Sequence, residues 1–120
     1  MGREIGKLSA RVIELLNLPL KIGQPIYLGQ TNIAHMQERH LADYQKYGAH
    51  ISTILSDPDY VGMNPKDNSV EYVKEFQIDG EYVKVAVRLS GNDVLYARSL
   101  YVLNRKRVEN FIQKGTLKKI

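Results

Sequence analysis

VEYVKEFQIDGEYVKVAVRLSGNDVLYARSLYVL, residues Val70 to Leu103, is the stretch that decides the fold. It contains three runs rich in Val, Tyr and Leu, at Val70–Ile78, Glu81–Leu89 and Val94–Leu103. The runs are separated by Asp79-Gly80 and by Ser90-Gly91-Asn92-Asp93, and both separators are hairpin turn signals. Because β-branched and aromatic residues favour strands, we expect a three-stranded antiparallel meander here.

Alternation along these strands assigns each side chain to one face of the sheet. In the middle strand every second residue is aliphatic, and the residues between them include Lys84 and Arg88. One face is therefore expected to be core, while the other carries two cations in line. In the last strand Ala97, Ser99 and Tyr101 are expected to share a face, opposite Arg98, Leu100 and Val102.

A histidine-bearing segment, TNIAHMQERHL at Thr31–Leu41, precedes the meander and is predicted to form one short helix. Thr31 or Asn32 can cap its first turn, since a short side-chain oxygen accepts from the free amides there. Helical spacing places Ile33, Met36 and His40 on one stripe and His35, Glu38 and Arg39 on a different face. We therefore expect His40 to face the body of the protein. A hydrogen-bonded core histidine beside a solvated charged face is the alternative interpretation.

Outside these two segments the sequence predicts further helices and one short strand. Apolar residues recur at helical spacing over Arg3–Leu18, where Pro19 ends the run, and over Tyr44–Leu55, where Gly48 is the weak point. Pro25–Leu28 is a brief apolar segment that predicts a strand. The Ser56–Asp59 segment stops the second of these helices and leads into a polar loop.

The final helix is expected to start after Asn104 and to end near Gly115. Its first turn is Arg105-Lys106-Arg107, which places three cations where the helix dipole prefers anions. This pattern suggests that an external anion such as phosphate completes a site there, or that the turn is simply a solvated basic surface.

The overall composition is typical of one globular domain, and the helical first half followed by the meander predicts an α+β fold. The chain has 120 residues, 43% of them hydrophobic, and a formal net charge of +4, which favours encounter with polyanions. It has no cysteine, so a thiol nucleophile and thiolate metal sites are excluded. No apolar run reaches the roughly 18 residues of a membrane span, and the first residues lack a signal-peptide core. We expect a cytoplasmic single domain, with a leading helix at 1–20, a core at 26–104 and a C-terminal helix and tail at 105–120.

Three short motifs occur in a suggestive order: HMQERH at His35–His40, DPDY at Asp57–Tyr60 and ARSLY at Ala97–Tyr101. Together with the meander, they resemble the phage-associated branch of the barnase/EndoU/colicin/RelE-like nucleases, over about Ile26 to Asn104. The resemblance implies N-terminal helices packed on a small antiparallel sheet. It also implies a toxin-like or phage-associated endoribonuclease that uses no metal or cofactor. In that reaction the ribose 2′-hydroxyl attacks the adjacent phosphate and leaves a 2′,3′-cyclic phosphate.

The resemblance implies a role for each matching residue. His40 or His35 would be the base or the acid, because the unperturbed pKa of histidine lies near 6.5. Arg39, Lys84 and Arg88 would stabilise phosphate charge, with Lys84 and Arg88 as alternatives for one role. Ser99 and Tyr101 would position the substrate. Further RNA contacts are expected from basic residues outside this set, which are Arg98, Arg105, Lys106 and Arg107.

Other functions remain open from the sequence. A zinc hydrolase helix needs histidines four residues apart, and His35 and His40 stand five apart, which argues against a metal site. A noncatalytic nucleic-acid-binding or phage-assembly module on the same fold would explain the basic charge without using the histidines. If the protein is a toxin, the resemblance implies an acidic immunity or antitoxin partner. The RNA substrate and the oligomeric state are not indicated.

Overall fold

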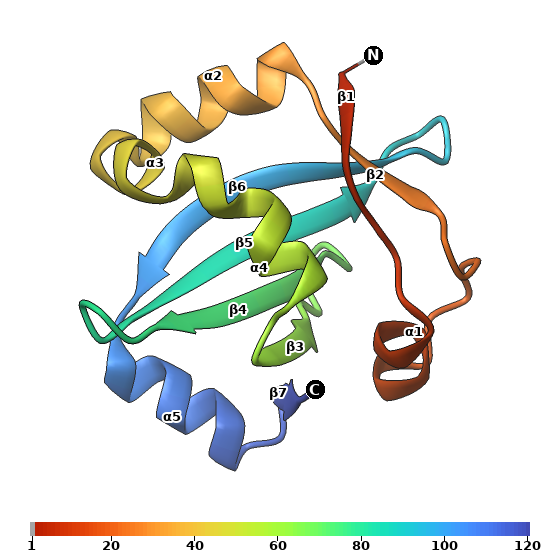
Figure 1. The fold of residues 1–120 in the computed structure, drawn as a ribbon. Helices are drawn as coiled ribbons and strands as arrows, with labels where there is room; N and C mark the ends of the chain where they lie inside the picture. The colour runs from red at the N-terminus through yellow and green to blue at the C-terminus, as the bar shows by residue number, and fades with distance from the viewer. Residues whose placement is uncertain (1) are drawn as a thin grey trace.

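The computed structural model describes residues 2–120 and confirms an α+β fold built on one seven-stranded sheet (Figure 1). The strands are β1 (Arg3–Lys7), β2 (Pro25–Leu28), β3 (Tyr60–Met63), β4 (Val70–Phe76), β5 (Glu81–Leu89), β6 (Leu95–Leu103) and β7 (Leu117–Lys119). The helices are α1 (Ala10–Leu16), α2 (Gln30–Arg39), α3 (Leu41–Tyr47), α4 (Ile51–Ser56) and α5 (Arg105–Gln113), with a 3-10 turn η1 (Gly48–His50) before α4. None of the helices in the described part of the chain could cross a membrane.

The predicted meander forms the centre of the sheet, whose strand order is β1-β2-β6-β5-β4-β3-β7. Strands β4, β5 and β6 pair antiparallel, as expected, and β2 joins β6 in parallel. The predicted alternation of β5 is also confirmed, because Val83, Val85 and Val87 are buried in the larger core. Helices α2 to α4 cover that face of the sheet (Figure 1).

On the opposite face a helix packs only against one end of the sheet. Helix α5 packs there through Val108 against Val73, Tyr82 and Leu103, which form a second, smaller core with Leu117. These sheet residues lie near the turn between β4 and β5. The remainder of this face is therefore free to carry the polar residues of β5 and β6.

The expected leading helix over Arg3–Leu18 is wrong in its first part. Residues Arg3–Lys7 form strand β1, which pairs antiparallel with β2, and the helix starts only after Ser9. The Ser9 side chain accepts a hydrogen bond from the Val12 amide at 3.2 Å and caps α1. The helix ends at Leu16, because Asn17 adopts a left-handed conformation two residues before Pro19. Pairing with a distant strand overrides the local helical spacing.

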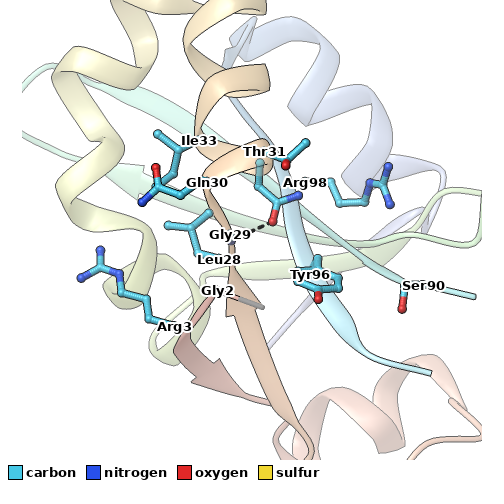
Figure 2. A pocket seen from close by; sticks show the side chains of 11 residues that line it. Gly2, Arg3, Leu28, Gly29, Gln30, Thr31, Ile33, Ser90, Tyr96 and Arg98 are labelled. Atoms are coloured by element: carbon cyan, nitrogen blue, oxygen red, sulfur yellow. Dashed lines mark hydrogen bonds between the residues drawn. The ribbon is translucent and has the colours of Figure 1, made fainter. Parts of the chain in front are cut away.

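The histidine-bearing helix also differs from the prediction at both ends. Gly29, and neither Thr31 nor Asn32, occupies the N-cap position, and the Gly29 amide donates to the Asn32 side chain at 2.9 Å (Figure 2). At the other end α2 stops at Arg39, because His40 has non-helical backbone angles (φ −145°, ψ 63°) and is the N-cap residue of α3. The helix over 44–55 is likewise divided, at Gly48 as expected.

Two short strands, β3 and the edge strand β7, lie where the sequence predicted loop and tail. Strand β3 follows the DPDY turn and pairs with β4, and Asp59 fixes the turn by accepting from the Glu75 amide at 2.7 Å. Strand β7 pairs on its other side. The two backbones approach closely at Gly62, where any Cβ would clash with the Thr116 carbonyl oxygen. Strands this short contain too few residues to show the alternation of apolar and polar side chains that would predict them.

Candidate active site

A buried ion pair lies on the face of the sheet opposite α2 to α4, which we call the open face because helix α5 covers only one end of it. The Lys84 ammonium on β5 is 2.8 Å from the Glu71 carboxylate on β4, and the two residues are only 8% and 9% exposed. Burial by itself lowers the pKa of the Lys84 ammonium, but the interactions with Glu71 and Tyr101 outweigh it and leave the pKa raised. Lys84 is therefore a fixed cation at neutral pH.

Tyr101 and His40 continue this cluster toward solvent. Tyr101 is paired with Lys84 across β5 and β6, and the Lys84 nitrogen lies 4.7 Å from the centre of the Tyr101 ring. The His40 ring stacks on Tyr101, with ring centres 4.9 Å apart and an angle of 28° between the planes. His40 is exposed and Tyr101 is half-buried. The cluster thus leads from a buried carboxylate, through a cation and a phenol, to an accessible imidazole.

His40 contacts the sheet for a different reason from the one that the helical wheel suggested. It belongs to no helical stripe, because it is the residue at the α2–α3 junction. The pairing of β2 with β6 is limited to the start of β6, so the later part of β6 has a free edge on that side. There the Val102 amide donates to the Asp43 carboxylate of α3 at 3.0 Å. This hydrogen bond holds the start of α3, and with it His40, beside Tyr101.

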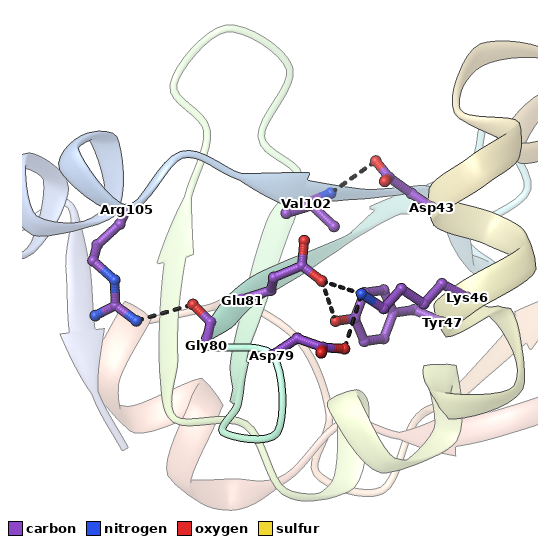
Figure 3. A network of polar contacts seen from close by, with 8 residues as sticks. All are labelled: Asp43, Lys46, Tyr47, Asp79, Gly80, Glu81, Val102 and Arg105. Atoms are coloured by element: carbon purple, nitrogen blue, oxygen red, sulfur yellow. Dashed lines mark hydrogen bonds and ion pairs between the residues drawn. The ribbon is translucent and has the colours of Figure 1, made fainter.

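A second polar cluster fixes the other end of α3 (Figure 3). Lys46 pairs with Asp79 at 2.9 Å and with Glu81 at 2.7 Å, and the Tyr47 hydroxyl donates to Glu81 at 2.6 Å. The hydrogen bonds from Lys46 and Tyr47 hold the pKa of the Glu81 carboxyl below its usual range. Helix α3 is therefore attached both to the edge of β6 and to the β4–β5 turn.

Ser99 lies two residues before Tyr101, next to an irregularity in the pairing of β5 with β6. Ser99 is opposite Ala86, whereas Ala97 is opposite Val87, so one extra residue of β6, Arg98, lies between the two pairs. The expectation that Ala97 shares a face with Ser99 and Tyr101 is therefore wrong, since Ala97 belongs to the core under the helices. The irregularity leaves Ser99 half-buried, and Glu71 is also opposite Ala86, on its other side.

The other predicted catalytic residues are not in this cluster. Arg88 lies four residues along β5 from Lys84, or about 13 Å at the usual rise of a strand, and is 3.8 Å from Asp67. His35 and Arg39 are exposed on α2. Within residues 2–120, no ion pair, side-chain hydrogen bond or aromatic contact links His35 or Arg39 to Lys84.

The predicted nucleic-acid contacts fall in two separate places. Arg98 lines a cavity beside the start of α2. The Arg105 guanidinium already has partners in the protein. It pairs with Glu75 at 3.2 Å, donates to the Gly80 carbonyl at 2.9 Å and lies over the Tyr82 ring. Lys106 and Arg107 remain exposed in the first turn of α5. Among residues 2–120 no group of three or more His, Asp or Glu side chains is placed to hold a metal ion.

Sequence reasoning missed two residues that organise the cluster. Glu71 was overlooked because its closeness to Lys84 depends on the pairing register of β4 and β5, which the turn between them does not reveal. Asp43 was overlooked because its acceptor role depends on the free edge of β6. The sequence does contain one signal for Glu71: it is an acidic residue in a predicted strand, and the neighbouring predicted strand carries a lysine.

The α+β fold, with helices on one face of a seven-stranded sheet, is consistent with the nuclease family that the three motifs had suggested. Residues 3–110 match the family described as phage-Barnase-EndoU-ColicinE5/D-RelE like nuclease 3, and the chain belongs to this family. The match starts well before Ile26, so the first strand and helix are part of the family domain. Comparisons with curated proteins and with solved structures gave no match. Membership in this family makes the chain a phage-related, nuclease-like domain with nucleic acid as its substrate.

Proposed function

We propose that this nuclease domain cleaves RNA without a metal ion, with His40, Tyr101 and Lys84 at the centre of the reaction. The observation that carries the proposal is the contact of an accessible imidazole with a phenol whose ring lies beside a buried lysine that is charged at neutral pH. Transesterification at phosphorus needs a base, an acid and a cation close together, and this cluster supplies the cation and a group for one of the two proton transfers.

The proposed reaction forms a bond between the ribose 2′-oxygen and phosphorus and breaks the bond between phosphorus and the 5′-oxygen. A base removes the 2′ proton, and an acid gives a proton to the departing 5′-oxygen. His40 performs one of these two transfers, because imidazole both accepts and donates protons near neutral pH. The products are a 2′,3′-cyclic phosphate end and a free 5′-hydroxyl end.

Lys84 stabilises the negative charge that develops on the phosphate oxygens in the transition state. Glu71 acts through Lys84 as a positioning residue, because the 2.8 Å ion pair fixes the ammonium on the open face. The hydroxyls of Ser99 and Tyr101 are hydrogen-bond donors on the same part of β6 and hold the phosphate in place. Lys84 is favoured as the phosphate cation because it contacts Tyr101, on which His40 stacks. Arg88 lies about 13 Å from Lys84 and would contact the RNA further along.

The test is incubation of purified protein with mixed cellular RNA in excess EDTA, with analysis of the fragment ends. We expect wild-type protein to produce 2′,3′-cyclic phosphate ends and His40→Ala to cleave about 10²- to 10⁴-fold more slowly. His35→Ala is the matched control, because it removes an exposed imidazole from α2, five residues before His40, and we expect it to cleave at the wild-type rate.

Three results would contradict the proposal: no cleavage by wild-type protein, cleavage that EDTA abolishes, or equal losses in the two histidine variants. If neither wild-type protein nor His40→Ala cleaves RNA, yet both bind it with the same salt dependence, the chain is a noncatalytic nucleic-acid-binding module.

A further inference from the structure

A cavity of about 810 Å³ lies at the start of α2, where that helix meets β6 and the ends of β1 and β2 (Figure 2). This volume is in the range of cavities that hold small organic ligands. The residues that line the cavity include two arginines, Arg3 and Arg98, and no acidic residue. The lining therefore favours a negatively charged ligand.

Arg98 is the more buried of the two arginines that line this cavity. It is half-buried on β6 and, within residues 2–120, forms neither an ion pair nor a side-chain hydrogen bond. Arg88 and Arg105, by contrast, are paired with carboxylates. A half-buried guanidinium without an acidic neighbour presents all its donors to a ligand, and its planar geometry suits a phosphate group.

The other lining side chains suit a nucleotide. Tyr96, two residues before Arg98, is a half-buried aromatic ring in contact with Tyr27, at 6.4 Å between ring centres, and so offers a surface for a base. Thr31 at the start of α2 and Ser90 at the end of the β5 strand add hydroxyl groups. Figure 2 shows Tyr96 and Arg98 on β6 with Thr31 nearby.

The cavity and the proposed catalytic cluster lie at the two ends of one strip of surface. Tyr96 and Tyr101 on β6 lie opposite Arg88 and Lys84 on β5, which are four residues or about 13 Å apart at the rise of a strand. Helix α2 contacts β6, has its first turn at the cavity, and is followed by His40. Its ten residues span about 15 Å. The two estimates agree, and Ser99 lies between the two sites.

We infer that this cavity is a subsite for single-stranded RNA, in which Arg98 binds a backbone phosphate and Tyr96 stacks on a base away from the cleaved bond. The inference rests on the proposed function, since it adds a second contact point for the same substrate. A dinucleotide at the His40 cluster is too short to fill a site about 15 Å away. A longer strand fills both sites, and its affinity therefore depends on Arg98 and Tyr96.

The experiment measures binding without turnover, in a His40→Ala background that leaves the RNA intact. The probes are fluorescein-labelled RNA oligonucleotides, a dinucleotide and a decanucleotide, and the readout is fluorescence anisotropy at several salt concentrations. Arg98→Ala and Tyr96→Ala are each expected to weaken decanucleotide binding about 5- to 10-fold and to reduce the advantage of the decanucleotide over the dinucleotide. Only Arg98→Ala is expected to lower the salt slope, by about 0.7 for one phosphate contact.

Arg11→Ala is the matched control, because it removes one positive charge from an exposed arginine on α1, outside the cavity. Unchanged decanucleotide binding in Arg11→Ala, with losses in the two cavity variants, supports the subsite. Equal losses in Arg11→Ala and Arg98→Ala, or wild-type affinity in both cavity variants, overturn it. Arg98→Gln, which keeps most of the side chain, replaces Arg98→Ala if circular dichroism shows that the alanine variant is unfolded.

The failure of this inference can be distinguished from the failure of the proposed function. Wild-type protein that cleaves RNA while the Arg98 and Tyr96 variants bind normally overturns only the subsite. Protein that binds the decanucleotide through Arg98 and Tyr96 but does not cleave RNA overturns only the reaction.

Discussion

Replacement of the buried ion pair by methionine separates its effect on stability from its effect on activity. Lys84 and Glu71 are 8% and 9% exposed, and their charged atoms are 2.8 Å apart. Glu71→Met leaves a buried ammonium without its partner, and Lys84→Met leaves a buried carboxylate without its partner. Loss of one member of such a pair costs about 3–5 kcal/mol. For a domain of this size that corresponds to a decrease in melting temperature of about 12–20 °C.

The double variant Glu71→Met/Lys84→Met is expected to regain most of this stability. A buried ion pair is often no more stabilising than apolar residues of similar volume, because the desolvation of two charges offsets their attraction. We therefore expect the double variant to lie within about 1 kcal/mol of wild type. It should nevertheless cleave RNA about 10²- to 10³-fold more slowly, because it lacks the cation that stabilises the transition state.

The assays are urea unfolding followed by far-ultraviolet circular dichroism, since the chain has no tryptophan, and RNA cleavage under conditions in which each variant is folded. A loss of less than about 1 kcal/mol in Glu71→Met would refute the reasoning on stability, because it would mean that solvent already screens the pair. A folded double variant that cleaves at the wild-type rate would refute the role of Lys84.

The same pair predicts a dependence on alkaline pH. The pKa of Lys84 is raised in the folded protein, so the stabilisation from this group is fully present below the ordinary lysine pKa and is lost as the pH rises through the folded value. Wild-type protein is expected to lose stability in that range more steeply than the double variant, and parallel pH profiles of urea midpoints would contradict this.

Three further predictions concern the surroundings of the site. Asp43→Ala removes the acceptor of the Val102 amide, and we expect kcat to fall while KM changes little, because the α2–α3 junction loses its attachment to β6. Glu81→Gln is expected to reduce stability at neutral pH by an amount that disappears on acidification, since the pKa of Glu81 is lowered in the folded protein and its stabilisation is lost as the pH falls through that value. Gly62→Ala is expected to displace β7 and to lower stability by about 1–3 kcal/mol, whereas Gly91→Ala, where a Cβ meets open space, should have little effect.

Each of these predictions has a measurement and an opposite outcome. Steady-state kinetics of Asp43→Ala that show only a raised KM would mean that the junction affects binding and not the reaction. Equal acid midpoints for wild type and Glu81→Gln would mean that the carboxylate is effectively unpaired. Equal urea midpoints for Gly62→Ala and Gly91→Ala would mean that β7 does not need the close approach at Gly62.

The sequence by itself determined the meander and the α+β class. The strands around Val83 and Tyr101 carry long runs of β-favouring residues bounded by turn residues, so local chemistry and the period of two agree over many positions. The helix after Asn104 was equally predictable, because a capping residue and an apolar stripe occur together. Local patterns alone were therefore enough to assign Lys84 and Tyr101 correctly to strands.

The tertiary structure alone decided which of the predicted site residues meet. Glu71 lies beside Lys84 because of the register of β4 and β5, and the extra residue Arg98 separates the faces of Ala97 and Ser99. The short strand at Arg3–Lys7 forms because β2 pairs with it, and the one at Tyr60–Met63 lies between β4 and the distant β7. His40 contacts Tyr101 because a helix ends one residue earlier and the next begins at a free sheet edge. Local sequence sets which conformations a segment favours, but register, irregular pairing and edge contacts are free-energy differences between distant parts of the chain, which only the complete fold resolves.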